Sequence, residues 1–119
     1  MGIFNKLNAF ENIIDKIMPT VSLDTFLASV SDRIDEGIRE QRKQGKSFLG
    51  GKTFFRLSQN EQDILIDTEI YFIDSSGGYK RQEQSGSFPF MRLHASDRQE
   101  FVRSIDDTGR LCIEIDEPD

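Results

Sequence analysis

Apolar residues recur at helical spacing in the first third of the chain. In residues 3–18 they stand three and four positions apart, so the pattern predicts an amphipathic helix that ends before Pro19. A second stripe of the same spacing follows Ser22, which can cap a helix by accepting a backbone N–H, and it fades before Gly45. Because only a short link separates the two segments, we expect residues 1–45 to form an antiparallel helical hairpin.

The period changes to two after Lys52. Residues 62–74 are the clearest case, because apolar side chains occupy mainly the even positions and polar ones the odd positions. Residues 75–78 and 106–109 have the composition of tight turns. Further strands are expected at residues 79–85, 88–95, 99–105 and 110–115. The pattern therefore predicts an antiparallel meander of five or six strands.

Together these patterns predict an α+β fold in which residues 1–119 form a single domain. The helical hairpin of residues 1–45 is expected to pack on a curved antiparallel sheet of residues 52–116, and residues 117–119 to form an acidic tail. Gly50 and Gly51 are the best candidates for a hinge between the two halves. The composition agrees, since 10 Phe residues favour a pleated core.

Several classes of protein are excluded by what the chain lacks. A single cysteine, Cys112, cannot form an internal disulfide or a zinc site of CxxC spacing, and a single histidine, His94, excludes His-rich metal sites. We therefore predict no metal and no cofactor. No apolar run is longer than four residues, far short of the roughly 20 needed to span a membrane. With no secretory signal at the start, a cytoplasmic location is expected.

No catalytic residues are assigned from the sequence. Asp67 and Glu69 share one face of a strand, but charged residues are ordinary on the outer face of a sheet. Nothing in the pattern brings His94 and Cys112 together as a catalytic pair. We therefore favour a protein that is not an enzyme.

Charge is unevenly distributed along the chain. The net charge is −6, which argues against a nucleic-acid-binding protein. Residues 39–58 nevertheless carry +5 and residues 106–119 carry −5. Such segregated blocks can orient a protein partner or a second copy, so we predict a small protein-binding or assembly module. Its expected contact residues are Arg39, Arg42, Lys43, Lys46, Lys52, Phe88 and Phe90. Membrane-surface contact by residues 3–18 is not expected, because their charges cancel.

The alternative is a small-molecule-binding or enzymatic domain with a pocket between helices and sheet. Its polar groups would come from Asp67, Glu69, Tyr71, Arg92 and His94. A deep apolar pocket with converging polar groups would favour this alternative.

Overall fold

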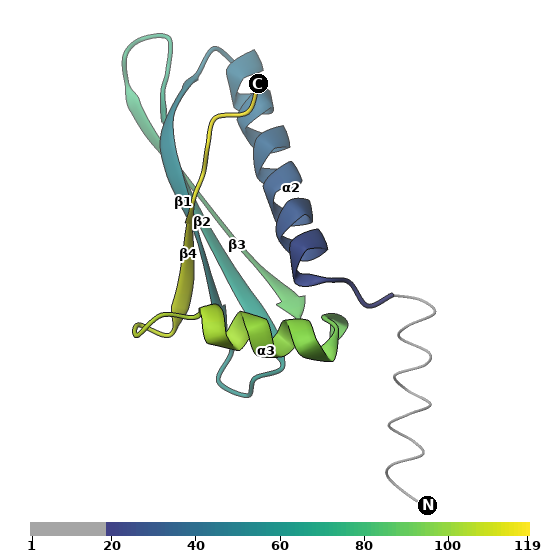
Figure 1. The fold of residues 1–119 in the computed structure, drawn as a ribbon. Helices are drawn as coiled ribbons and strands as arrows, with labels where there is room; N and C mark the ends of the chain where they lie inside the picture. Colours follow the sequence, from purple (N-terminus) through teal and green to yellow (C-terminus); the bar gives the residue numbers. More distant parts are fainter. Residues whose placement is uncertain (1–18) are drawn as a thin grey trace, which may run out of the picture.

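Residues 19–119 are described by the computed structural model, and they form an α+β fold (Figure 1). The elements, in chain order, are α2 (Leu23–Lys43), β1 (Ser47–Leu57), β2 (Asp63–Ile73), β3 (Tyr79–Pro89), the 3-10 helix η1 (Phe90–Arg92), α3 (Ala95–Ser104) and β4 (Arg110–Glu114). The strands form a four-stranded antiparallel sheet in the order β3-β2-β1-β4. Both helices pack on one face of this sheet, which we call the inner face; the other is the outer face.

Helix α2 follows the second apolar stripe. Ser22 caps it, because the Ser22 Oγ accepts the backbone N–H of Thr25 at 3.1 Å. The helix ends just before Gly45, whose φ of +87° is a conformation that glycine adopts most easily. This helix of the predicted hairpin is therefore confirmed. The first predicted helix lies outside the described residues, so the hairpin itself is not confirmed.

Strand β1 begins earlier than the change of period after Lys52 indicated, whereas β2 closely matches the strand predicted at residues 62–74. Strand β1 begins at Ser47, so Gly50 and Gly51 lie within it rather than at a hinge. Gly51 packs tightly against β2, because a Cβ there would stand 2.6 Å from the backbone oxygen of Glu69. In β2 the predicted alternation holds, with Ile64, Thr68, Ile70 and Phe72 all buried. Their shared face is the one that α2 and α3 cover.

The two predicted turns are confirmed by their hydrogen bonds. After β2, the Asp74 Oδ1 accepts the backbone N–H of Ser76 at 3.1 Å and of Gly78 at 2.7 Å. Its bond with the Ser76 hydroxyl is the main cause of a lowered Asp74 pKa, because it favours the charged carboxylate. Before β4, the Gly109 N–H donates to the Asp106 oxygen at 2.9 Å.

The strands predicted at residues 88–95 and 99–105 are wrong. Residues 90–92 form η1, and residues 95–104 form α3, so the sheet has four strands rather than five or six. Over seven or eight residues, a few apolar positions fit a strand and a helix about equally well. Tertiary contacts decide between them: Phe101 is fully buried against the core, and Val21 bridges to Leu93.

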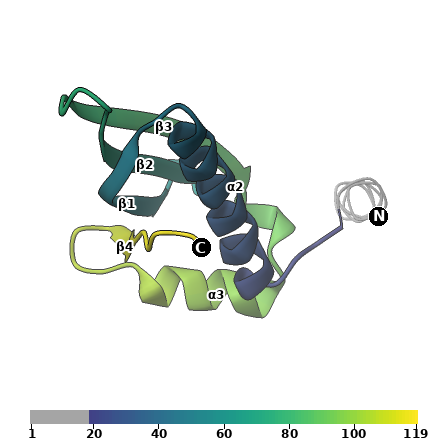
Figure 2. The same ribbon diagram turned by 90° about the horizontal axis from the view of Figure 1, so that it is seen from above.

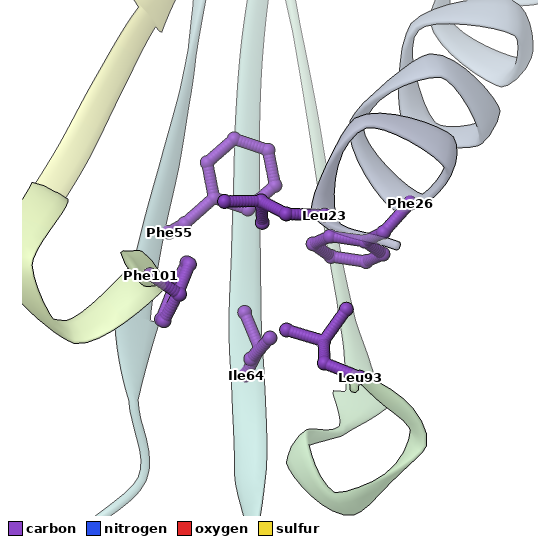
Figure 3. Packing of buried hydrophobic residues seen from close by; sticks show 6 residues of the cluster. All are labelled: Leu23, Phe26, Phe55, Ile64, Leu93 and Phe101. Carbon is purple, nitrogen blue, oxygen red and sulfur yellow. The ribbon is translucent and has the colours of Figure 1, made fainter. Parts of the chain in front are cut away.

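The core lies in two clusters along the inner face. The larger, shown in Figure 3, joins the start of α2 to β1, β2, α3 and the segment before α3. Its buried residues are Leu23, Phe26, Phe55, Ile64, Leu93 and Phe101. The smaller contains Ile38, Ile70 and Phe72. Between the two clusters, Thr53 of β1 faces Thr68 of β2 across the ladder, and both are buried. The middle of the core is therefore polar.

Candidate protein-contact edge

Strand β3 is an edge strand of the sheet that residues 19–119 form. Among residues 19–119 it pairs with β2 on one side only, and it lies at the opposite edge from β4 (Figure 2). Every residue of β3 except Phe88 is exposed. Long exposed edge strands are templates for pairing with another strand, so this edge is a candidate contact surface.

The hydrogen-bonding phase shows which backbone groups face outward. At one end of the β2–β3 ladder the Phe90 N–H donates to the Gln62 oxygen, and at the other the Asp74 N–H donates to the Gly78 oxygen, both at 2.9 Å. Hydrogen-bonded pairs alternate with non-bonded pairs in an antiparallel ladder. Even-numbered residues of β3 therefore bond to β2. The outward-facing N–H and C=O groups belong to Tyr79, Arg81, Glu83, Ser85 and Ser87.

The same odd-numbered residues carry side chains on the outer face. Arg81 forms an ion pair with Glu83, two residues along the strand. The Ser85 hydroxyl donates to the Asp67 Oδ1 at 2.8 Å, which ties β3 to β2. Tyr79, which is 62% exposed, stacks on the Tyr71 ring with the centroids 5.7 Å apart. The edge thus presents one cation, one anion and one aromatic ring in a fixed order.

The hydroxyl of Tyr71 completes this surface. It donates to the Glu69 Oε2 at 3.1 Å, and this bond raises the pKa of Tyr71 because it requires the protonated phenol. Glu69 in turn stands opposite Glu83 on β3 and Lys52 on β1 in the ladder register. The outer face next to the edge is therefore a mixed charged surface.

Most of the predicted basic contact residues lie at or just after the end of α2, and one lies on the outer face of β1. Arg42 binds the acidic end of the chain, with its Nη2 2.7 Å from the Glu117 Oε1 and 2.6 Å from the Pro118 oxygen. Lys46 donates to the Gln41 Oε1 at 2.6 Å. At the end of α2, Arg39 and Lys43 are exposed, and Lys52 lies on the outer face of β1. The basic and acidic blocks of the sequence thus meet within the chain at Arg42.

The two predicted contact phenylalanines pack against the core. The Phe88 ring lies 4.3 Å from the Phe26 ring between centroids, and the Phe90 ring lies 6.2 Å from that of Phe101. Both residues are half-buried at the edge of the larger cluster. Their contacts therefore hold β3 and α3 to the core.

The alternative pocket residues are spread over two regions. Asp67, Glu69 and Tyr71 lie on the outer face, away from both helices. Asp67 and Glu69 line an outer-face hollow of about 280 Å³. Arg92 is in η1, with its guanidinium 5.1 Å from the Phe88 ring centroid, and His94 directly precedes α3. The structure does not bring these five side chains to one hollow.

No family model, curated protein or solved structure matches this chain. Within residues 19–119, none of the helices is both long and apolar enough to cross a membrane. The same residues contain no group of three or more His, Cys, Asp or Glu side chains that could hold a metal ion.

The sequence pattern did not predict which residues of the edge strand β3 direct their backbone groups outward. The return arm after residue 78 is almost wholly polar, which is typical of an exposed edge strand. Which of its residues face outward depends on the pairing register with β2, and this register required the structure.

Proposed function

We propose that this chain is a non-enzymatic assembly module that pairs with a second copy of itself through the free edge of β3. The observation that carries the proposal is the row of outward-facing backbone groups along an exposed strand of 11 residues. A strand added to such an edge gains a ladder of main-chain hydrogen bonds. Side chains on the outer face then select the partner and the register.

The charges of β3 fit a second copy in one antiparallel register. Hydrogen bonding requires odd-numbered residues to stand opposite odd-numbered residues. Pairing centred on Gln82 sets Arg81 opposite Glu83 of the second copy, and the two-fold axis repeats this contact. Centring the pair on Arg81 or on Glu83 would set like charges against each other, which is destabilising. Centring it on Gln84 would set Arg81 opposite Ser87, with no charge pair.

The existing ion pair within β3 offers little resistance to this exchange. The side chains of Arg81 and Glu83 are 52% and 55% exposed, and exposed pairs contribute roughly 0–1 kcal/mol. Each group would exchange a partner on its own strand for one on the second copy. Most of the dimer's stability would therefore come from the backbone ladder, and the charges would set its register.

Charged residues on an edge also serve to prevent pairing, so their signs matter. A run of like charges repels a second copy, whereas the outer face of β3 carries one charge of each sign. Lys80 is also charged, but its side chain is on the inner face, where the Gln82-centred register sets it opposite Gln84. This arrangement favours self-pairing over edge protection.

The proposal is tested by charge reversal in the full chain, with molar mass measured by sedimentation velocity over a range of concentrations. Arg81→Glu and Glu83→Arg each set like charges across the two-fold axis, so each variant should dimerise more weakly than the wild type. The double variant should recover, because opposite charges again face each other. An equimolar mixture of the two single variants should also recover, since the heterodimer contains both complementary pairs.

The matched control is Arg39→Glu, which makes the same charge change on the exposed surface of α2. It should leave the dimer unaffected. A wild-type chain that stays monomeric at high micromolar concentration would overturn the proposal. So would a mixture of the single variants that fails to dimerise, or an equal loss of dimer in the control.

A further inference from the structure

A second feature of the fold is a hollow between α2, the sheet and the end of the chain. Its volume is about 320 Å³, at the small end of the roughly 300–1,000 Å³ typical of ligand pockets. It opens beside the polar middle of the core, between the two apolar clusters. The helix spans this gap with Leu27, Val30 and Ile34, which form one wall.

The opposite wall is formed by the inner face of the sheet. Phe55 and Thr53 of β1 line it, together with Ile113 of β4. Thr53 is 2% exposed, and its Oγ1 is buried without a hydrogen-bond partner among residues 19–119. A buried hydroxyl without a partner is unfavourable, because it loses its bonds to water and gains none in return. A ligand that brings a polar atom to this wall would remove that cost.

Residues 115–118 form a third side of the hollow and cover it there. Ile115 is held to the sheet, because its N–H donates to the Gly51 oxygen at 2.9 Å. Arg42 holds the following residues to the end of α2 through its contacts with Glu117 and the Pro118 oxygen. Figure 1 shows the C-terminus beside the last turns of the helix. Residues 115–118, which cover the hollow, are therefore held in place at both ends by contacts with the sheet and with α2.

The rim of the hollow is acidic. Its carboxylates come from Asp35 on α2, Glu114 at the end of β4, and Asp116 and Glu117 in the covering segment. Of the residues that line the hollow within the described part of the chain, none is a lysine or arginine. Arg42 offsets one of these carboxylates from outside, and the remaining negative charge would attract a cation.

We propose that this hollow binds a small organic cation: an ammonium group carried on an apolar body with a hydrogen-bonding group at the far end. The apolar walls would bury the body of the ligand. The rim carboxylates, Asp35 foremost because it is half-buried, would hold the ammonium group. The polar group at the other end would meet the Thr53 hydroxyl. This site is separate from the β3 edge.

Three probes that share one aromatic ring test the proposal by NMR titration of the full-length chain. Tyramine has both the ammonium and the hydroxyl group, phenethylamine lacks the hydroxyl, and 3-(4-hydroxyphenyl)propionate replaces the ammonium with a carboxylate. We expect saturable shifts of amides around the hollow with tyramine, weaker binding of phenethylamine, and no binding of the anion. Loss of one such contact should weaken binding by about tenfold.

Two variants assign the contacts. Thr53→Val should lower the affinity for tyramine to that for phenethylamine and leave phenethylamine binding unchanged. Asp35→Asn should weaken the binding of both tyramine and phenethylamine. Its matched control is Asp32→Asn, one turn earlier on α2 and outside the hollow, which should change neither affinity. Equal binding of tyramine and the anion, shifts confined to other surfaces, or no saturable shift at millimolar tyramine would each overturn the proposal.

Discussion

The hydroxyl of Thr53 gives a sharp test of how the core is built. The change Thr53→Val replaces this hydroxyl with a methyl group of similar size and shape, and it leaves the backbone ladder intact. Because the Thr53 Oγ1 is buried and has no partner among residues 19–119, the substitution breaks no hydrogen bond within that part of the chain. It removes only the cost of keeping a polar atom away from water. We therefore expect Thr53→Val to stabilise the folded protein.

The magnitude follows from the desolvation of a single hydroxyl. A buried polar group left unsatisfied costs roughly 1–3 kcal/mol. Taking the lower half of that range, the free energy of unfolding should rise by about 1–2 kcal/mol. In a domain of 60–100 residues, each 1 kcal/mol raises Tm by roughly 4–8 °C. The expected increase in Tm is therefore at least several degrees.

The assay is urea unfolding followed by circular dichroism, with Thr68→Val as the control. Thr68 stands opposite Thr53 in the ladder and is 6% exposed, but its hydroxyl is not among the buried atoms without a partner. The midpoint should rise for Thr53→Val with an unchanged m value, and less or not at all for Thr68→Val. An unfolding midpoint for Thr53→Val at or below that of the wild type would refute the reasoning.

Three further substitutions test other parts of the fold. Gly51→Ala should destabilise the sheet by about 1–3 kcal/mol in thermal unfolding, because its Cβ would stand 2.6 Å from the backbone oxygen of Glu69. Arg42→Ala should cost no more than about 1 kcal/mol, because its ion pair is part-exposed. It should nevertheless speed amide hydrogen exchange at residues 115–118. The Asp74 pKa is lowered in the folded state, so this carboxylate stabilises the fold above its unfolded pKa of about 3.9 and less as pH falls through the folded value. Asp74→Asn should therefore lose less stability than the wild type between neutral pH and pH values below about 4, measured by thermal unfolding.

Each of these substitutions has a matched control. Gly86→Ala lies on the edge strand with open space around its Cβ, so it should be nearly neutral where Gly51→Ala is not. Arg39→Ala removes an exposed cation from α2 and should leave exchange in the C-terminal segment unchanged. Asp32→Asn should keep the pH dependence of the wild type. Equal behaviour of a variant and its control would contradict the corresponding assignment.

The basic and acidic blocks of the sequence contact each other within the fold. The sequence suggested the basic residues as the contact surface, but Arg42 is engaged by Glu117 within the chain. The edge of β3 lies outside both blocks, whereas the hollow beside Thr53 takes three of its rim carboxylates, Glu114, Asp116 and Glu117, from the acidic block. Of the predicted basic contact residues, Arg42 is thus held by contacts within the chain.

Local signals were strong enough to predict α2, the β2 strand and the turns at residues 75–78 and 106–109. The stripe after Ser22, the alternation in residues 62–74 and the Gly at each turn act over a few neighbouring residues. They depend on backbone preferences and on the need to bury one face, which any tertiary arrangement must satisfy. The sequence by itself therefore determined the α+β class and most of these elements.

Tertiary structure decided the rest. Residues 95–104 form a helix because Phe101 enters the larger cluster, and this contact overrides an ambiguous local pattern. The outward phase of β3 depends on its register with β2, and a shift of one residue would exchange every outward-facing group. The hollow exists because α2, β1 and residues 115–118, which are distant in sequence, meet around Thr53. Such features depend on contacts between distant segments, which local patterns of apolar and polar residues do not encode.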